Sequence, residues 1–483
     1  MKNLLIKNLF FFLSLMTTMQ LTAQVVKFEK VYGNTGYEYG YSVVQTYDKG
    51  YAMAGATSSF GNGNTDAYLL KVDSLGAIQF QKMYGGVNID QAYCIKQTAD
   101  SGLIMAGYTN SFGNGGYDMY VNKTDALGNV TWSKTYGGTN WDFAYSIQQT
   151  TDGGYIIAGG TSSYGNGNED MYLVKINAKG DTSWTKTYGG SEDDEARSVK
   201  QTKDGGYILT GYTKSFGDSL GDIFTVKTNS IGDTLWTYTY KGATEDFSFD
   251  IIESIYNKYI IAGKTKRNNT GDFDGVTIEL TLSGKFKNMD YWGGPKEDGI
   301  QSITESPTGR VAIAGYTTSF GMGGTDFLLY LMNPYNSATF GQGNMEKAFS
   351  INKTSDGGYI ICGTSNSFSP FDHIYLVKTD SSGVSSGKII NVITNINTYS
   401  KISSKYTVYP NPTKDKININ TIAGIKIKSL TIKDILGKAY PAPLITVNQD
   451  KIEVDCSFLK NGMYFISIEN NYSIDIQRII IQH

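Results

Sequence analysis

Acidic side chains recur about every 52 residues along most of this 483-residue chain, and they are the first groups that could do chemistry. Hard cations such as Ca²⁺ bind carboxylate oxygens, so calcium is the one candidate cofactor. Alternatively, each carboxylate accepts backbone N–H bonds in its own loop. Strict recurrence favours this structural role, and we expect no bound cofactor. One series is Glu38, Asp90, Asp142, Asp194, Asp246, Asp298 and Glu346, of which the five Asp are the candidate metal ligands. The other series is Asp66, Asp118, Asp170, Asp222, Asp274, Asp326 and Asp372.

Three further carboxylates break the repeat and are the candidates for catalysis: Asp250, Glu253 and Glu305. Glu253 and Glu305 replace a glutamine that recurs in the earlier repeats, and they could form the acid pair of a glycan-active hydrolase or lyase. Sequence drift in older repeats explains these changes equally well. His373 is the only histidine within the repeats, so a histidine-based nucleophile relay is not expected. We predict that the protein is not an enzyme.

Aromatic residues recur in a second loop of the repeat, within the pattern S-[FY]-G-x-G. Exposed rings in these loops could stack on sugars or peptides, whereas rings packed between neighbouring loops would be structural. The candidate ligand-binding residues are Phe60, Phe112, Tyr164, Phe216, Phe320 and Phe368.

The repeat that positions these residues is clearest at 145–190, and it predicts four short strands at 145–150, 155–159, 171–176 and 182–188. Asp152-Gly153-Gly154 marks the first tight turn, and Asn177 to Gly180 marks the last. A four-stranded meander with two apolar faces must stack between copies of itself. Units of 40 to 50 residues that stack in this way indicate an all-β fold, a β-propeller.

The two ends of the array predict the number of blades. Phe28 and Tyr32 match the aromatic pattern of a fourth strand, but no other strands of a blade precede them. The last copy, at 349–379, has three strands and lacks the fourth. We therefore expect a seven-bladed β-propeller whose last blade is closed by the N-terminal strand, an arrangement that removes free sheet edges.

The chain divides into four predicted parts. Residues 1–23 have the basic, apolar and polar order of a secretory signal peptide. Residues 24–380 form the propeller, 381–403 a flexible linker rich in Ser, Asn and Gly, and 404–483 a second, smaller domain. No other stretch could span a membrane, and a net charge of -3 gives no sign of nucleic-acid binding.

Three motifs in residues 404–483 resemble the landmarks of the C-terminal type A sorting domain of the type IX secretion system. They are Tyr409-Pro410-Asn411-Pro412, Asp434 to Lys438 with Gly437, and Leu459 to Tyr464 with Gly462. Lys438 stands where Arg is common in that family. The resemblance implies an immunoglobulin-like β-sandwich, transport across the outer membrane of a Gram-negative bacterium, and removal of the domain afterwards. The propeller itself resembles secreted bacterial repeats of the DGG-Y-I-x-x-G type.

These features together predict an exported β-propeller that binds a glycan, a protein or an adhesion ligand. The protein would pass through the periplasm and then be released or anchored at the outer cell surface, with residues 404–483 engaging the secretion machinery. A secreted glycan-active enzyme and a passive structural surface protein are the alternatives. The sequence does not identify the ligand.

Overall fold

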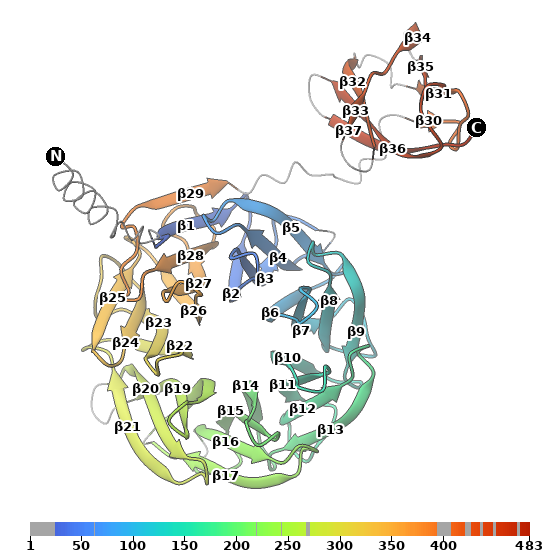
Figure 1. Ribbon diagram of the computed structural model, residues 1–483. Coiled ribbons are helices and arrows are strands. Elements are labelled where there is room, and N and C mark those ends of the chain that lie inside the picture. Colours follow the sequence, from blue (N-terminus) through green and yellow to red (C-terminus); the bar gives the residue numbers. More distant parts are fainter. Residues whose placement is uncertain are drawn as a thin grey trace, which may run out of the picture. The chain divides into compact units, whose positions relative to one another are not determined.

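The computed structural model describes residues 25–393 and 407–483, apart from 62, 219, 243, 267–270, 421–426, 435–437, 448–450 and 471–473. The predicted signal peptide lies outside the described residues. The chain forms two compact units, Met1–Asn395 and Ile396–His483. All regular elements of the described part are β-strands (Figure 1). Within that part, no helix is long and apolar enough to cross a membrane.

Seven β-sheets form a ring in the first unit, and we number them blades 1 to 7 (Figure 1). Each has four antiparallel strands, and blade 7 carries a fifth. The innermost strands are β2 (Glu38–Gln45), β6 (Asp90–Gln97), β10 (Asp142–Gln149), β14 (Asp194–Gln201), β18 (Asp246–Glu253), β22 (Asp298–Glu305) and β26 (Glu346–Lys353). The second strands are β3 (Tyr51–Thr57), β7 (Leu103–Thr109), β11 (Tyr155–Thr161), β15 (Tyr207–Thr213), β19 (Lys258–Lys266), β23 (Val311–Thr317) and β27 (Tyr359–Ser365). The third strands are β4 (Asp66–Val72), β8 (Asp118–Thr124), β12 (Asp170–Ile176), β16 (Asp222–Thr228), β20 (Phe273–Thr281), β24 (Asp326–Leu331) and β28 (His373–Thr379). The fourth strands are β5 (Ile78–Tyr84), β9 (Val130–Tyr136), β13 (Thr182–Tyr188), β17 (Thr234–Tyr240), β21 (Phe286–Trp292), β25 (Asn336–Phe340) and β1 (Phe28–Gly33).

The core of the propeller lies between the blades. In blade 3, every residue of β11 and β12 is buried, whereas the outer strand β13 is largely exposed. One apolar cluster joins Ile104 and Val121 of blade 2 to Ile147 and Ile157 of blade 3. Because both faces of a blade are apolar, each blade requires a neighbour on both sides. The predicted seven-bladed all-β fold is confirmed.

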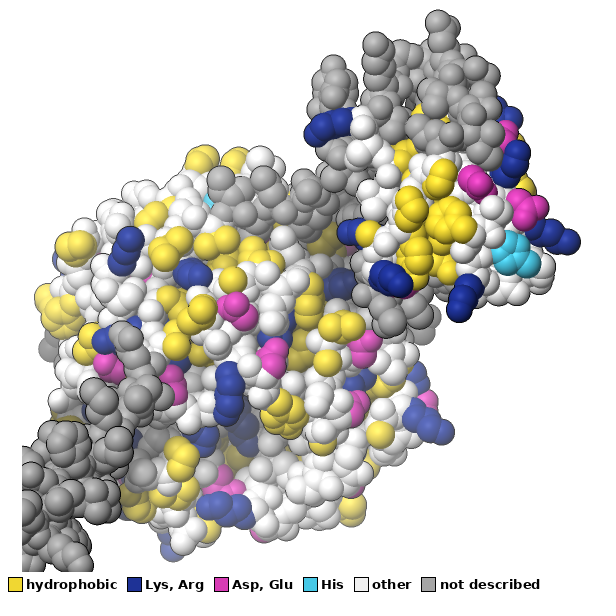
Figure 2. Space-filling view, turned by 45° about the horizontal axis from the view of Figure 1, so that its top comes forward, with side chains coloured by type: hydrophobic (Ala, Val, Ile, Leu, Met, Phe, Trp, Pro, Cys, Tyr) yellow, Lys and Arg dark blue, Asp and Glu magenta, His cyan; other side chains and the backbone are white. Residues whose placement is uncertain are grey.

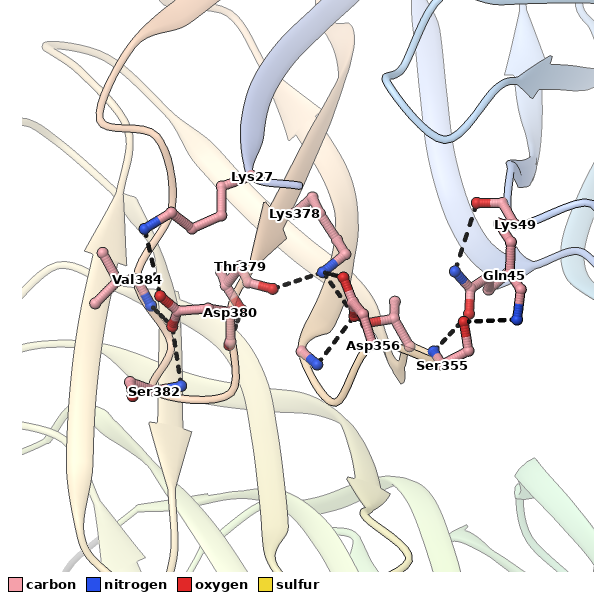
Figure 3. Close-up of polar contacts among 12 residues, drawn as sticks. Lys27, Gln45, Lys49, Ser355, Asp356, Lys378, Thr379, Asp380, Ser382 and Val384 are labelled. Atoms are coloured by element: carbon pink, nitrogen blue, oxygen red, sulfur yellow. Dashed lines mark hydrogen bonds and ion pairs between the residues drawn. The ribbon is translucent and has the colours of Figure 1, made fainter. Parts of the chain in front are cut away.

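The N-terminal strand closes the ring, as predicted. β1 pairs antiparallel with β28, with Phe28 opposite Lys378, and so supplies the fourth strand of blade 7. An ion pair of 3.3 Å between Lys27 and Asp380 lies beside this junction (Figure 3). The first and last parts of the array are thereby held in one sheet.

A fifth strand, β29 (Ile389–Ile393), lies outside β1 and runs parallel to it, with Ile389 opposite Glu29. The prediction of a flexible linker at 381–403 is therefore wrong for this segment. Ser is the commonest residue of 381–403, but the apolar β-branched residues around Ile390 and Val392 favour a strand. Ile389 also packs against the apolar core between blades 6 and 7.

A side-chain clamp joins neighbouring blades at the end of their innermost strands. The last residue of the strand accepts a hydrogen bond from a backbone N–H in the first turn of the preceding blade. Figure 3 shows the clamp between blades 7 and 1, where Gln45 Oε1 lies 2.7 Å from Ser355 N. The other glutamine clamps pair Gln97 with Tyr47, Gln149 with Ala99, and Gln201 with Thr151.

The second unit is a sandwich of two four-stranded sheets, which confirms the predicted immunoglobulin-like class. One sheet contains β30 (Thr407–Tyr409), β31 (Lys416–Asn420), β35 (Lys451–Asp455) and β34 (Leu444–Val447). The other contains β33 (Ala439–Tyr440), β32 (Ile427–Asp434), β36 (Gly462–Asn470) and β37 (Ile474–Ile481). Ile417 and Val454 of the first sheet pack against Ile432 and Ile466 of the second.

Five blades bury a lysine of the third strand against the aspartate of the first turn, a pairing that the sequence analysis missed. In blade 3, Lys175 Nζ lies 2.9 Å from Asp152, and the lysine side chain is only 7% exposed. Partial burial opposes ionisation of Asp152, but hydrogen bonds from Thr150 and Lys175 lower its pKa to about 2. The other pairs are Lys71–Asp48, Lys123–Asp100, Lys227–Asp204 and Lys378–Asp356.

We predict that Asp152→Asn lowers the free energy of unfolding by about 1–3 kcal/mol at pH 7, because Lys175 is left buried without its anionic partner. Asp181→Asn is the matched control, since Asp181 pairs with Lys134 on the surface. Urea unfolding of both variants provides the measurement. Equal effects of the two substitutions would contradict a structural role for the buried pair.

Candidate functional site

A β-bulge interrupts the innermost strand of every blade and turns one side chain away from the regular pleat. The pairing register shifts at the same place each time, for example between Ala144 and Ser146 in blade 3. Bulges commonly re-aim a side chain in this way. We call the seven residues at the bulges the channel ring: Tyr41, Tyr93, Tyr145, Arg197, Phe249, Gln301 and Phe349. The strands that carry them surround the centre of the propeller (Figure 1).

Five members of the channel ring form a continuous arc across blades 7, 1, 2, 3 and 4. The rings of Tyr41 and Tyr93 stack with centroids 4.6 Å apart. Phe349 contacts Tyr41 edge-on at 5.5 Å, and Tyr145 contacts Tyr93 edge-on at 5.3 Å. The guanidinium carbon of Arg197 lies 4.1 Å from the centroid of the Tyr145 ring, within cation–π distance.

The channel ring borders a central cavity of about 210 Å³. All its members except Phe249 line the cavity, together with Lys96, Lys200 and Asp250 of the same strands. The wall therefore combines aromatic ring faces with charged groups.

Two ion pairs organise the charged part of the wall. Arg197 Nη2 lies 2.9 Å from Glu195 Oε2, and Lys200 Nζ lies 2.9 Å from Asp250 Oδ1. Asp250 also accepts hydrogen bonds from Ser198 and from the N–H of Ile303. Burial opposes ionisation of Asp250, but the charge and hydrogen bond of Lys200 lower its pKa.

Aromatic stacks lead from the channel ring toward the rim that carries the loops before the innermost strands. In blade 1, Tyr41 stacks on Tyr39 and Tyr39 on Tyr37. In blade 3, Tyr145 stacks on Phe143, which contacts Trp141 edge-on. Tyr37 is 42% exposed and Trp141 is 57% exposed, so the approach to the cavity presents open ring surface.

Glu169 is a buried acid beside the channel ring. Burial and the nearby Glu195 raise its pKa to about 8, with Arg197 opposing and Asp193 and Asp142 adding to the shift. Its Oε1 is buried and accepts no hydrogen bond from a described residue. Gly160 leaves the necessary space, because a Cβ at that position would lie 1.9 Å from this oxygen. The surroundings of Glu169 therefore favour its protonated form.

The two recurrent acidic series meet between adjacent blades and hold the loops of one rim. Asp142 Oδ2 accepts hydrogen bonds from Gly138 N at 2.8 Å and from Ser163 Oγ at 2.6 Å. Asp118 and Asp142 each place an oxygen within 2.5 Å of the position that a Cβ on Gly137 would occupy. The described residues contain no group of three or more His, Cys, Asp or Glu side chains that could hold a metal ion. These hydrogen bonds support the structural interpretation of both series.

The six loop aromatics predicted to bind a ligand are distributed one to a blade and do not converge. Most pack on an aromatic ring of the third strand in the same blade: Phe60 on Tyr68, Phe112 on Tyr120, Tyr164 on Tyr172, Phe216 on Phe224 and Phe368 on Tyr375. Phe60 is buried, whereas Phe112, Tyr164, Phe216 and Phe320 are 40–47% exposed. A ligand-binding role for this set stays a prediction.

The predicted acid pair does not face the cavity. Glu253 accepts a hydrogen bond from Lys203 N, and Glu305 accepts one from Ile255 N, both at 2.9 Å. These are the same interblade clamps that glutamine makes in blades 1 to 4, so carboxylates replace amides without a change of role. Asp250 alone of the three catalytic candidates lines the cavity. His373 is buried and contacts the carbonyl oxygen of Asn34.

The channel ring was not predicted from the sequence, although its residues follow the 52-residue repeat. Tyr41, Tyr93 and Tyr145 recur at 52-residue steps, and the same step leads to Arg197 and Phe249. Since both faces of a propeller blade are buried, hydrophobic alternation does not show which residues face the channel. The position of the bulge determines which residue faces the channel, and hydrophobic alternation does not predict a bulge.

The C-terminal unit can now be compared with known families. Residues 407–482 match the family model described as the secretion system C-terminal sorting domain. This chain carries a C-terminal sorting domain. The recognition of a sorting domain for type IX secretion is confirmed, and a domain of this family marks the protein for export and secretion. The match covers the sandwich and does not extend to the propeller.

Other similarities are weak. The chain is 26% identical over 133 residues to the regulatory protein FlaEY of Caulobacter vibrioides, which corresponds to 24% of this chain and 14% of that protein. The WD40 domain of Neurospora crassa Pan2 has a TM-score of 0.42 at 10% identity, covering 73% of this chain and 99% of that domain. Puromycin hydrolase has a TM-score of 0.43 at 10% identity, covering 81% of this chain and 62% of that protein. The fold assignment depends on the strand order described above.

The landmarks of the sorting domain mostly stabilise its sandwich. Asn411 Oδ1 accepts a hydrogen bond from Ile480 N at 2.8 Å, and Asp434 accepts one from Lys438 N at 3.0 Å. Leu459 and Tyr464 are buried in the core. Gly437 lies outside the described residues. Among the described residues of the sorting domain, Tyr409, Phe458 and Phe465 are exposed large hydrophobic side chains, and Figure 2 shows hydrophobic side chains gathered on its visible face.

Titration of Glu169 should be visible in the stability of the propeller. Its folded pKa of about 8 lies above the ordinary value of about 4.3, so protonation stabilises the fold at low pH and this contribution is lost as pH rises toward 8. We predict that Glu169→Gln removes a decline on the order of 1 kcal/mol per pH unit between pH 5 and pH 8.

Urea unfolding at pH 5, 6.5 and 8 measures the decline, with Glu192→Gln as the control because Glu192 is an exposed neighbour in the loop before β14. A pH dependence that is unchanged in Glu169→Gln would show that Glu169 is ionised in the folded protein.

Proposed function

We propose that this protein is an exported binding module that holds an extracellular glycan at the mouth of the propeller channel. The observation that carries the proposal is the continuous arc from Phe349 to Arg197, which borders the central cavity. Flat aromatic faces suit the apolar faces of sugar rings, and nearby polar groups select among hydroxyl and charged substituents. The exposed rings of Tyr37 and Trp141 extend the same surface toward solvent.

The export route is the second part of the proposal. Residues 1–23 direct the chain to the periplasm, and the sorting domain then engages the type IX machinery for passage across the outer membrane. The propeller is left at the cell surface or released, where it meets the glycan.

Hydrolysis of the bound glycan is a second candidate function, favoured by one observation. Burial and the neighbouring Glu195 raise the pKa of Glu169, and two adjacent carboxyl groups of which one has a raised pKa are the kind of pair that glycoside hydrolases use. Glycan that is recovered shortened after incubation with the full chain, and intact after incubation with Glu169→Gln, would establish this activity. Recovery of intact glycan in both cases would show that the protein binds the glycan without hydrolysing it.

For the binding function, we predict that Tyr93→Ala weakens glycan binding about tenfold or more, because Tyr93 contacts the rings on both sides of it in the arc. Phe112→Ala is the matched control, since Phe112 is an exposed loop ring outside the channel. Titration calorimetry of the full chain with glycans retained from a broad array provides the measurement. If Phe112→Ala weakens glycan binding and Tyr93→Ala does not, the binding site lies at the loop aromatics and not at the channel ring. The absence of any retained glycan or surface protein would favour a passive structural role.

For export, we predict that deletion of residues 404–483 retains the propeller in the periplasm, because the segment that engages the secretion machinery is lost. Cell fractionation of the producing bacterium, beside cells that make the full chain, provides the measurement. Delivery of the truncated chain to the surface at the normal level would contradict the role of this domain.

A further inference from the structure

We propose that the central cavity recognises the acidic end of a polysaccharide: a terminal uronate whose ring packs within the aromatic arc and whose carboxylate pairs with Arg197 and Lys96. This inference rests on the glycan-binding function proposed above and names the class of glycan.

The charges of the cavity favour an anion. Glu195 balances Arg197, and Asp250 balances Lys200, in each case through an ion pair of 2.9 Å. Lys96 also lines the cavity, and it makes no ion pair or hydrogen bond with a described residue. Asp250 is the only carboxylate among the residues that line the cavity, and it pairs with Lys200, so no lining carboxylate compensates Lys96. The cavity thus carries one positive charge without a partner, which matches a monoanionic sugar.

Arg197 is placed to select a carboxylate. Glu195 engages only its Nη2, and no described residue accepts a hydrogen bond from its Nη1 or Nε. The side chain is 32% exposed while the Tyr145 ring holds its plane. A guanidinium with free donors matches the two oxygens of a carboxylate, and a preformed cation–π contact reduces the entropy lost on binding.

The size of the cavity limits how a chain can enter. Its volume of about 210 Å³ is below the roughly 300–1,000 Å³ of sites that enclose drug-sized ligands, so it admits one sugar ring. The polysaccharide must then enter by its end. Its following sugar units would lie against the aromatic stacks that lead to Tyr37 and Trp141. Recognition of a chain end by a buried terminal site follows from this geometry.

The test compares two trimers that differ only in charge, galacturonic acid and galactose, as ligands of the full chain in titration calorimetry. We expect the acidic trimer to bind at least tenfold more tightly, with an advantage that shrinks as salt is added. Lys96→Gln should remove most of this advantage. The Lys96 side chain makes no ion pair or hydrogen bond with a described residue, and Arg197→Gln is a second variant with the same expected loss. Lys186→Gln on the outer strand β13 is the matched control and should retain the full preference.

The failures are distinguishable. Equal binding of the two trimers, weakened by Tyr93→Ala, would overturn the uronate inference and leave the glycan-binding function in place. A preference for the acidic trimer that survives both Lys96→Gln and Arg197→Gln would place the acidic group elsewhere and overturn the inference. Binding of neither trimer while an acidic peptide binds would overturn both proposals.

Discussion

Closure of the ring is the constraint on which the rest of the structure depends. Each blade has two apolar faces, and every one of them is covered only if the first blade meets the last. The strand that makes this possible comes from the opposite end of the array: β1 pairs with β28, and β29 then covers β1. The clamp from Gln45 to Ser355 joins blades 7 and 1 in the way that other clamps join their neighbours (Figure 3). A closed ring fixes the innermost strands around the channel, and with them the cavity.

Two kinds of position follow from this architecture. Positions that recur in most blades build the blade. The acidic series holds the rim loops, the buried Lys–Asp pairs hold the first turns of five blades, and the clamps hold neighbouring blades together. The bulge residues border the channel instead of the packed core between blades, and there the blades differ. Tyr, Arg, Phe and Gln all occur in the channel ring, although the surrounding backbone is the same. Specificity is therefore expected at the bulges and stability at the repeated positions.

This division explains how much could be predicted from the sequence. The seven blades, the closing strand and the sorting domain follow from periodicity, from the incomplete repeats at the two ends and from three motifs. Recurrence also singles out residues such as Asp142, which accepts hydrogen bonds from its loop, and Phe112, which packs on Tyr120. Glu253 and Glu305 stood out as exceptions, yet each makes the ordinary clamp, because a carboxylate oxygen accepts the same hydrogen bond as an amide oxygen. The role of Arg197 could not be predicted because its position in the channel depends on a bulge. The role of Glu169 could not be predicted because its raised pKa depends on burial beside Glu195.

The central claim is that the ligand site lies at the channel ring. A crystal structure of the full chain soaked with an oligogalacturonate tests this claim most directly. We predict electron density for one sugar ring in the central cavity, with its carboxylate beside Arg197 and Lys96 and its face on the tyrosine arc. Density on the outer loops beside Phe112 or Tyr164, with an empty channel, would contradict it.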